Sequence, residues 1–400
     1  MTQNNQKLLD EKHIPEGYKK TEVGLIPEGW MIRTIGDFAP LQRGFDLPSR
    51  LRTDGLYPVI YSNGFVNTHL EYKVKGPGIV TGRSGTIGKV HYVEQNYWPH
   101  NTSLWVTKFN GVDPKFIYFL FSKIGFERFS SGSGVPTLNR NDAHSFRIQL
   151  PKSIEEQQKI ATALSDTDTL ISELEKLIEK KQAIKTATMQ QLLTGKTRLP
   201  EFALREDGMP KGYKDSELGQ IPEDWEVDKI ANTLSITTGS RNTQDKINDG
   251  HYPFFVRSQT VERINTYSFD GEGVLTAGDG VGTGKIFHYI NGKCDIHQRV
   301  YLMSNFKQNL DGYYFYIYFS NYFYDRIMSM TAKSSVDSVR REMIADMLIF
   351  LPPINEQKKI SLVIKNLYAE LDVLSSKLNK LLKIKQGMMQ ELLTGKTRLV

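Results

Sequence analysis

The sequence predicts an α+β fold in which two similar domains are separated by a long antiparallel coiled coil of two helices, with a pseudo-two-fold internal repeat. Three observations predict it. Two blocks of sequence occur twice. The regions between them contain short strand-like runs broken by turn residues. A long segment free of glycine and proline follows each region, at 153–182 and at 354–386. A chain of 400 residues is long enough for two separate cores.

The repeat is visible by direct comparison of the two halves. PEGYKKTEVGLIPEGW at 15–30 and PKGYKDSELGQIPEDW at 210–225 agree at ten of sixteen positions. MQQLLTGKTRL from Met189 and MQELLTGKTRL from Met389 agree at ten of eleven. Between these blocks a few landmarks recur at an offset of 195: Asp54, Gly55, Tyr57 and Pro58 return as Asp249, Gly250, Tyr252 and Pro253. Such a pattern is typical of two domains that share one architecture and bind different ligands. Two copies that have drifted apart without such a purpose are the alternative.

Each variable region has the pattern of a small α+β domain. The first contains the strand-like runs YPVIYSNG, GPGIVTGRSGTIGKVHYV and SFRIQLP, and the second contains YPFFVRS, GEGVLTAGDGVGTGKIFHYI and DMLIFLP. A helical stretch precedes the last strand in both. We expect domains at 18–150 and 213–352, a central long helix with its linker at 151–212, and a C-terminal long helix at 353–400.

The two long segments carry apolar side chains at the spacing of a coiled coil. From Ile360, steps of four and three reach nine apolar residues in ten positions, and the first copy has a weaker stripe that Leu170, Leu177 and Ile184 widen. A wider stripe suggests contact with more than one neighbour. A core helix is the plain alternative, but about 40 residues is too long for a domain of this size. The predicted helix-to-helix residues are Ile160, Leu164, Ile171, Leu174, Ile178, Ile360, Ile364, Leu367, Leu371, Leu374, Leu378 and Leu381.

The ends of the chain suggest a circular arrangement. The central copy continues past LLTGKTRL into a segment that leads to the second domain, whereas the matching segment of the other copy stands at the N-terminus. We therefore expect residues 1–17 to pack beside the end of the C-terminal helix. Gly195 and Gly395 stand where a glycine commonly ends a helix.

Composition limits the class of protein. The net charge is +6 and the pI is about 9.0, which suits a polyanionic partner without proving one. Cys294 is the only cysteine, so a disulfide framework and a cysteine-based metal cluster are excluded. The N-terminus has no apolar signal segment and no run of 18 apolar residues occurs, so we expect a cytoplasmic protein that does not enter a membrane.

This organisation resembles the specificity subunit of type I restriction-modification enzymes across essentially the whole chain. The resemblance rests on the order of domain, helix, domain, helix, on the helix starts at Pro151, Glu156, Gln157 and Ile160 and at Pro353, Glu356, Gln357 and Ile360, and on the two LLTGK ends.

The resemblance implies a non-catalytic DNA-binding subunit. Each variable region would be a target-recognition domain that reads one half of a bipartite double-stranded site, and the helices would set the spacer between the halves. The helices would also dock two adenine methyltransferase subunits, and motor-nuclease restriction subunits would join them. S-adenosylmethionine, ATP and Mg²⁺ would be bound by those partners, and no cofactor is expected in this chain.

DNA recognition requires cations for phosphates and forked or amide side chains for base edges, and we expect them on loops. Any single arginine is more often a solvated charge or half of an internal ion pair. The candidates of the first domain are Arg43, Arg50, Arg52, Arg83, Ser84, Thr86, Thr137, Asn139 and Arg140, and those of the second are Arg241, Asn242, Arg257, Ser258, Arg299, Ser335, Asp337 and Arg340. Asn101 and His297 could reach bases or satisfy buried backbone groups, whereas the repeated Trp30 and Trp225 are expected to pack in cores.

The sequence contains no recognisable catalytic motif. LPPI at 351–354 lacks the polar and aromatic ends of an adenine-methyltransferase strip. Neither GKT segment has the glycine that a P-loop needs five residues earlier, and Lys89 and Lys285 are followed by Val90 and Ile286 where it needs serine or threonine. Two rival functions remain. One is a DNA-cleaving nuclease, for which no carboxylate and lysine cluster is evident. The other is a coiled-coil scaffold or DNA-mimicking decoy, although a decoy should be acidic.

Overall fold

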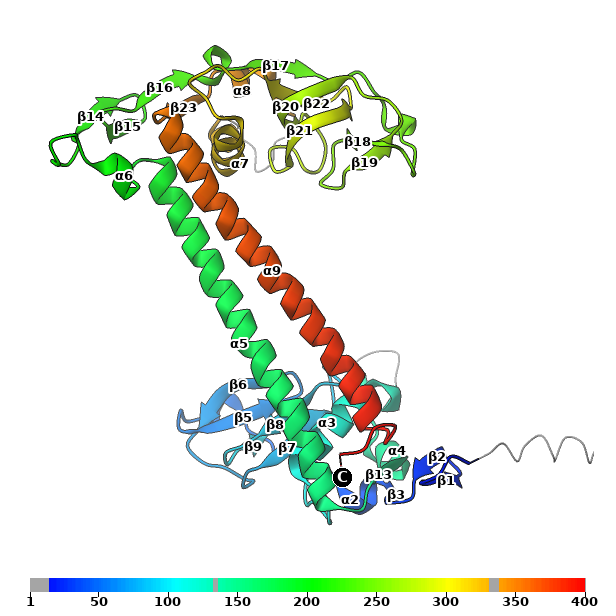
Figure 1. The fold of residues 1–400 in the computed structure, drawn as a ribbon. Helices are drawn as coiled ribbons and strands as arrows, with labels where there is room; N and C mark the ends of the chain where they lie inside the picture. The colour runs from blue at the N-terminus through cyan, green and yellow to red at the C-terminus, as the bar shows by residue number, and fades with distance from the viewer. Residues whose placement is uncertain (1–13, 132–135, 331–337, 400) are drawn as a thin grey trace, which may run out of the picture. The chain divides into compact units, whose positions relative to one another are not determined.

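The computed structural model describes residues 14–131, 136–330 and 338–399. Its contacts divide the chain into two units, residues 1–176 with 375–400 and residues 177–374. Each unit contains one of the expected domains together with parts of both long helices (Figure 1). The unit boundaries therefore fall within the helices.

The first unit is built on two small sheets. One has the strand order β4-β10-β7-β8 and the other β6-β5-β9, in which β5 and β9 are parallel. Their strands are β4 Leu41–Arg43, β5 Tyr57–Tyr61, β6 Gly64–His69, β7 Gly78–Gly82, β8 Val90–Val93, β9 Trp98–Pro99 and β10 Ser103–Val106.

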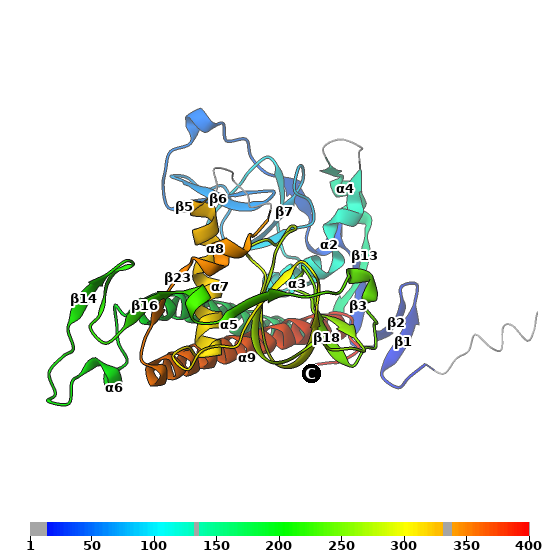
Figure 2. The ribbon, with the colours of Figure 1, turned by 90° about the horizontal axis from the view of Figure 1, so that it is seen from above.

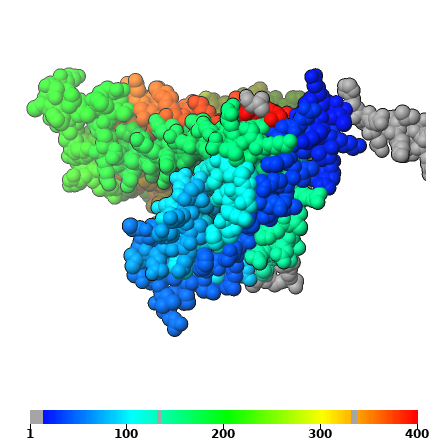
Figure 3. Space-filling view, turned by 90° about the horizontal axis from the view of Figure 1, so that it is seen from below, coloured from blue at the N-terminus to red at the C-terminus, as the bar shows by residue number. Residues whose placement is uncertain are grey.

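Two further strand pairs join the domain to its flanking segments. The hairpin of β1 Tyr18–Thr21 and β2 Gly24–Pro27 leads directly to β3 Trp30–Thr34 (Figure 2). The last strand, β13 Arg147–Pro151, pairs antiparallel with β3. Residues from the start and the end of the domain, dark blue and green, therefore lie side by side on its surface (Figure 3).

The second unit repeats this plan with one difference. Its sheet has six strands in the order β17-β22-β20-β21-β18-β19. The strands are β17 Ser235–Thr238, β18 Tyr252–Phe255, β19 Glu262–Ile264, β20 Phe269–Ala277, β21 Phe287–Ile296 and β22 Val300–Ser304. The long strand β21 pairs with both β20 and β18. It therefore corresponds to two strands of the first unit, β8, which pairs with β7, and β9, which pairs with β5. One continuous strand thus joins the two sheets that are separate in the first unit.

The flanking pairs recur as well. β14 Tyr213–Ser216 pairs with β15 Gly219–Pro222, and β16 Glu226–Lys229 pairs with the last strand, β23 Leu348–Leu351. The predicted helices before the last strands are α3 Pro114–Ile124 and α7 Gly312–Ser329. Shorter elements complete the described fold: α2 Ile35–Phe38, α4 Arg140–Ser145, α6 Pro200–Ala203, α8 Arg341–Ala345, η1 Ser49–Leu51, η2 Phe126–Phe129, η3 Ile230–Asn232, η4 Thr243–Asp245, β11 Ser130–Ser131 and β12 Thr137–Leu138.

Each domain core extends onto the ends of both long helices, α5 Ile154–Leu193 and α9 Ile354–Leu392. In the first unit, Trp30 and the aromatic face of α3 share a buried cluster with Leu164 of α5 and Leu392 of α9. In the second, Trp225 and α7 share one with Leu192 and Ile364. Both tryptophans are fully buried, as expected of packing residues. The helices are therefore part of each domain's core at their ends.

The residues of the predicted coiled-coil stripe are turned away from solvent within each unit. All twelve predicted positions are buried or half-buried. Two lysines in the stripe carry acidic partners on the opposite helix: Lys181 Nζ lies 2.7 Å from Glu370, and Lys385 Nζ lies 2.5 Å from Asp168. Low residue numbers on one helix thus meet high numbers on the other, so the helix segments in each unit run antiparallel.

The two glycines expected at the helix ends do end the helices. Gly195 and Gly395 have φ of +71° and +75°, the left-handed conformation that glycine adopts without strain. Tyr18 donates a hydrogen bond from its hydroxyl to the Gly395 carbonyl at 3.0 Å, and Tyr213 donates one to Gly195 at 3.1 Å. The chain just after the N-terminal segment thus lies at the end of α9. Residues 1–13 of that segment lie outside the described residues.

The repeated Glu-Gln pair at each helix start has a structural role. Gln357 accepts a hydrogen bond from the Asp311 backbone at 2.9 Å and donates one to the Pro352 carbonyl at 2.8 Å. Gln157 makes the same two bonds to Asp113 and Pro151. The side chain satisfies backbone groups where strand, helix start and α3 or α7 meet.

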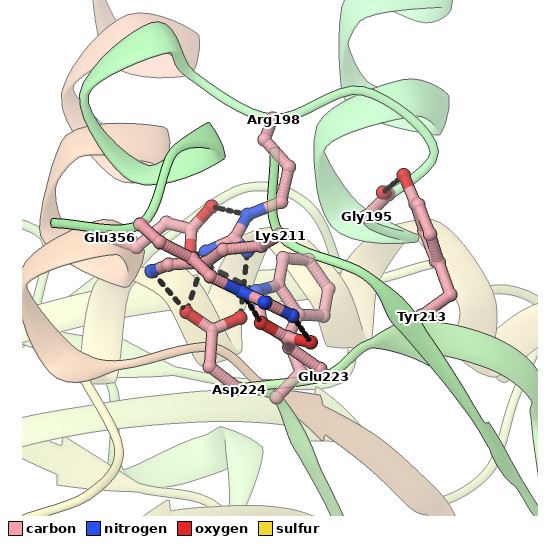
Figure 4. A network of polar contacts seen from close by, with 9 residues as sticks. Gly195, Arg198, Lys211, Tyr213, Glu223, Asp224 and Glu356 are labelled. Carbon is pink, nitrogen blue, oxygen red and sulfur yellow. Dashed lines mark hydrogen bonds and ion pairs between the residues drawn. The ribbon is translucent and has the colours of Figure 1, made fainter. Parts of the chain in front are cut away.

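The neighbouring glutamate joins the two long helices. Glu356 accepts hydrogen bonds from the Trp225 indole at 3.0 Å and from Arg198, whose Nε lies 2.8 Å away (Figure 4). Arg198 belongs to the segment that leaves α5, so this contact ties the end of one helix to the start of the other. Both charged side chains are almost fully buried. Glu156 binds the Trp30 indole and Arg398 in the same way. Removing one partner of such a buried pair costs about 3 to 5 kcal/mol.

The second unit adds a further carboxylate to this network. Asp224 accepts hydrogen bonds from Arg198 Nη1 and from Lys211, both at 2.7 Å. Burial raises the pKa of Asp224, but the two cations outweigh burial and lower it overall. The repeat places Gly29 where Asp224 stands and Glu16 where Lys211 stands. A cavity of about 390 Å³, lined by Gly29 and Arg398, is found at this place in the first unit.

We predict that Leu374→Ala lowers the free energy of unfolding by about 2 to 5 kcal/mol, because it deletes methyl groups from the buried stripe and leaves a cavity. Leu374 is 9% exposed and its neighbour Val373 is 55% exposed. Val373→Ala is therefore the matched control, expected to change stability by less than about 0.5 kcal/mol. Urea unfolding of the two variants measures both. Equal losses would contradict the buried stripe.

We predict that Glu16→Lys combined with Gly29→Asp stabilises the first unit by roughly 1 to 2 kcal/mol, because the new carboxylate gains charge-assisted hydrogen bonds from Arg398 and a lysine partner. The three atoms nearest to a Cβ at Gly29 all belong to the flexible end of Arg398, the nearest at 3.0 Å, so the backbone can stay in place. Hydrogen exchange of residues 14–131 measures the gain. Glu16→Lys alone is the control and should change little, and a double variant less stable than wild type would show that the site cannot hold a carboxylate.

Candidate nucleic-acid interface

Four separate segments of the first domain meet at one edge of its sheets. The backbone N–H of Phe45 donates to Pro99 at 2.8 Å, that of Arg83 donates to Thr102 at 2.9 Å, and that of Leu138 donates to Arg83 at 2.8 Å. We call residues 43–46, 83–86, 99–102 and 136–140 the rim of the first domain. These hydrogen bonds bring together candidates that the sequence spreads over about a hundred residues.

The second domain builds the same edge with the same backbone bonds. Arg241 N–H donates to Ile296 at 3.1 Å, Gly278 N–H donates to Arg299 at 2.8 Å, and Val339 N–H donates to Gly278 at 2.7 Å. We call residues 239–242, 278–281, 296–299 and 338–340 the rim of the second domain. The equivalence of the backbone contacts gives a position-by-position match of the two rims.

Side chains at matched positions of the rims differ while one contact is conserved. In the first domain the Asn101 amide donates to the Asp46 carboxylate. In the second, Gln298 stands at the position of Asn101 and donates to Asn242 at 2.7 Å. An amide thus binds a side-chain oxygen in both rims, but the charge and length of the two partners change. Surfaces of this kind present different hydrogen-bonding patterns from a common frame.

A histidine holds the same turn in both rims. His297 Nδ1 accepts from the Arg299 N–H at 3.0 Å, and His100 Nδ1 lies 3.1 Å from the Thr102 hydroxyl. Burial is the main cause that lowers the pKa of both histidines. A neutral ring with an acceptor nitrogen fits this contact, in which Nδ1 of His297 satisfies a backbone N–H.

The candidates of the first domain are not equivalent in the structure. Arg83 is half-buried, and its guanidinium has no hydrogen bond or ion pair with the part of the chain that the structure describes. Arg43 forms an exposed ion pair with Asp46 at 3.1 Å. Asn139 caps α4 by accepting from the Asn141 N–H, so its carbonyl oxygen is occupied. Within the rim, Arg140 is exposed and Ser84, Thr86 and Thr137 are half-buried. Arg50, which is exposed, and Arg52, which is half-buried, lie outside the rim segments, in η1 and directly after it.

In the second domain most predicted arginines have acidic partners. Arg241 Nε lies 3.0 Å from the fully buried Asp295, and Arg257 and Arg299 both bind Asp279. Burial raises the pKa of Asp295, but hydrogen bonds from Thr266, Ser268 and Arg241 lower it overall. Arg241 is therefore largely used inside the domain. Asn242 caps η4, Ser258 donates to the Thr260 carbonyl at 2.8 Å, and Arg340 is exposed at the start of α8. The predicted residues Ser335 and Asp337 lie outside the described residues.

Sequence reasoning missed the acidic members of these rims. Asp46 and Asp279 were not predicted, because no local pattern marks an acid as the partner of an arginine from another loop. The sequence did contain a signal for Asp279. When the glycine-rich segments of the two domains are aligned, Asp279 matches Ser84, which was itself a predicted candidate.

Two other kinds of functional feature, a metal site and a membrane-spanning helix, are not found in the described parts of the chain. Within residues 14–131, 136–330 and 338–399, no three His, Cys, Asp or Glu side chains gather as a metal site would require. None of the helices within those ranges combines the length and apolar character needed to span a bilayer.

Fold and rims together define a class of protein: a chain with two homologous recognition domains, each carrying a polar, arginine-bearing rim, combined with two long paired helices. Known proteins agree with this class. The family model for the type I restriction modification DNA specificity domain matches residues 27–186 and again residues 222–383. The chain therefore belongs to the family of type I restriction-modification specificity proteins.

Individual relatives agree along the whole length. Two proteins of Methanocaldococcus jannaschii, the putative type I restriction enzyme MjaX specificity subunit and the MjaVIII specificity subunit, are each 25% identical to this chain. The matches cover 98% and 96% of this chain and 99% and 96% of those proteins. A solved S subunit of a type I restriction-modification system from M. genitalium shares the fold, with a TM-score of 0.66 at 15% identity over 91% of this chain and 96% of that one.

We predict that the thermal midpoint falls as the pH is lowered from 7.5 to 5.5. Burial is the largest cause that lowers the pKa of five histidines, so the unfolded chain takes up protons near pH 6.5 that the folded chain resists. Stability is then lost as pH falls through that range. These histidines are His91, His100, His144, His288 and His297. Differential scanning fluorimetry at constant ionic strength measures the shift, and a midpoint that is flat or rises toward pH 5.5 would contradict it.

Proposed function

We propose that this chain is the subunit that gives a type I restriction-modification complex its DNA specificity, with each domain reading one half of a bipartite site. The observation that carries the proposal is the pair of rims. One backbone frame, held by equivalent hydrogen bonds, presents different side chains in the two domains. Family membership makes the ligand DNA, and unlike rims read unlike sequences, so the site is asymmetric.

We propose further that the paired helices serve as spacer and docking surface. Helices of 40 and 39 residues are each on the order of 60 Å long at about 1.5 Å per residue. The stripe of α5 that widens the coiled-coil pattern remains exposed, with Leu170, Leu177 and Ile184 at 53%, 39% and 40%. Residues seven apart share one helix face, and an exposed apolar face of this kind favours a protein partner. Two adenine methyltransferase subunits are the partners that the resemblance implies, with restriction subunits joining them.

Catalysis is assigned to those partners in this proposal. S-adenosylmethionine would be bound by the methyltransferase subunits, and ATP and Mg²⁺ by the complex that cleaves. This chain would contribute no reacting group, and would act in the cytoplasm where its DNA is found. The rival functions give different outcomes. A nuclease would cut DNA as the purified chain with a divalent metal, and a scaffold would assemble partners without any sequence preference.

We predict that a host carrying this chain with its methyltransferase partners modifies adenines in one bipartite motif with an unread spacer. Sequencing of modified adenines measures this, with a host lacking the chain as reference. Arg83→Ala should relax or weaken one position in one half-site by roughly 1 to 3 kcal/mol and leave the other half unchanged.

Lys108→Ala provides the matched control, since Lys108 is an exposed cation that follows the end of β10 opposite to rim residues 99–102. It should not change the motif. Modification without a shared motif, or a motif that does not depend on this chain, would refute the proposed function. A motif unaffected by Arg83→Ala would remove Arg83 from the reading surface.

A further inference from the structure

Three segments of the second domain bring two arginines onto one carboxylate. Arg257 Nη1 lies 2.8 Å from one oxygen of Asp279, and Arg299 Nη1 lies 2.5 Å from the other. Arg257 follows β18, Asp279 lies in the glycine-rich segment after β20, and Arg299 directly precedes β22. The arginines are 39% and 61% exposed and the aspartate 20% exposed, so the carboxylate sits below a surface formed by two guanidinium groups.

The matched positions of the first domain hold three hydroxyl side chains. The backbone bond from His297 to Phe255 corresponds to that from His100 to Ile60, which places Ser62 opposite Arg257 and Thr102 opposite Arg299. Ser84 stands opposite Asp279, because the bridge from Asp279 to Ser338 corresponds to that from Ser84 to Thr137.

These hydroxyl residues also lie together. Ser62 N–H donates to the Thr102 hydroxyl at 3.4 Å, and Ser84 N–H donates to the Thr102 carbonyl at 3.2 Å. One three-residue cluster is therefore Arg, Asp and Arg in one domain and Ser, Ser and Thr in the other. All three members of the cluster therefore differ between the two domains.

The cluster in the second domain has the chemistry of a base reader. Each arginine uses only Nη1 on the carboxylate, so its Nη2 and Nε have no hydrogen-bond partner among the described residues and form an open donor edge. Two parallel donors match the O6 and N7 acceptors of guanine in the major groove. Because Asp279 already orders the long side chains, less rotamer freedom is lost on binding than with free arginines.

A phosphate contact is the less favourable alternative. The carboxylate cancels one of the two positive charges and would itself repel a phosphate, which weakens a purely electrostatic contact. At base edges the carboxylate is not a handicap, since it can also accept from a cytosine amino group. Burial raises the pKa of Asp279, but both arginines outweigh it, so the group stays ionised.

We propose that Asp279 is a positioning residue that presents Arg257 and Arg299 to guanine in the half-site read by the second domain. The inference rests on the proposed function and names guanine as one nucleotide base that the second domain reads. The first domain, with Ser62, Ser84 and Thr102 in these places, has no such guanine contact. The half-site of the second domain therefore contains at least one guanine whose N7 is required.

The test uses the complete complex with its partner subunits and the motif found by adenine sequencing. Guanines of the second domain's half-site are replaced one at a time by 7-deazaguanine, which keeps base pairing and removes only the N7 acceptor. Wild type should bind at least one substituted DNA about ten- to a hundred-fold more weakly. Substitution in the first domain's half-site should not depend on residue 279.

Two variants separate positioning from a merely structural role. Asp279→Asn should weaken binding to the natural site and shrink the 7-deazaguanine effect, with the slope of binding against salt unchanged. The triple variant Arg257→Ser, Asp279→Ser and Arg299→Thr takes the residues that the first domain already holds in the same frame, and should lose the guanine requirement. Lys307→Ala, an exposed cation beyond the other end of β22, is the control and should bind both DNAs as wild type does.

Different results would overturn this inference and the proposed function. A bipartite motif whose second half lacks guanine, or an undiminished 7-deazaguanine effect in Asp279→Asn, overturns this inference and leaves the proposed function standing. Absence of any motif that depends on this chain overturns the proposed function itself.

Discussion

Two buried ion pairs connect the end of each long helix with the start of the other. Arg198 binds Glu356 and Arg398 binds Glu156, and each glutamate also accepts from a buried tryptophan of the neighbouring domain. A charge inside a core is stable only when its partner is in place. Helix start, helix end and domain are therefore fixed together in each unit. This explains why tryptophan, glutamate, glutamine and the TGKTR segment recur in both halves of a chain whose other side chains have diverged.

The same constraint explains where variation is tolerated. The segments of each rim are joined to one another through backbone hydrogen bonds, such as those from Arg83 to Thr102 and from Gly278 to Arg299, and a backbone bond does not depend on the side chain. Side chains on the rim can therefore change without loss of the fold. A recognition protein needs this separation, because new specificity must not destabilise the domain that carries it.

The sequence predicted the parts of the structure that depend on local pattern. The helix stripe from Ile360, the terminal glycines at 195 and 395 and the buried tryptophans were all read from spacing or repetition, and the structure confirms them. The rim could be predicted only as a set of loops. Parallel pairing of β5 with β9 brings distant segments together, and no periodicity reveals it. For the same reason the partner of Arg241, the buried Asp295, could not be predicted from sequence, since 54 residues separate them.

The ion pairs on the rims also show why single arginines are poor predictors of function. Arg241 and Arg257 looked alike in sequence, yet Arg241 is held by a fully buried carboxylate and two hydroxyl groups share that acid, whereas Arg257 shares a half-buried carboxylate with a second, more exposed arginine. In the first arrangement the guanidinium of Arg241 stabilises the domain itself. The second fixes the guanidinium and leaves an edge open to a ligand. Under the proposed function, burial of the acid, more than the presence of the arginine, distinguishes a structural ion pair from one that reads DNA.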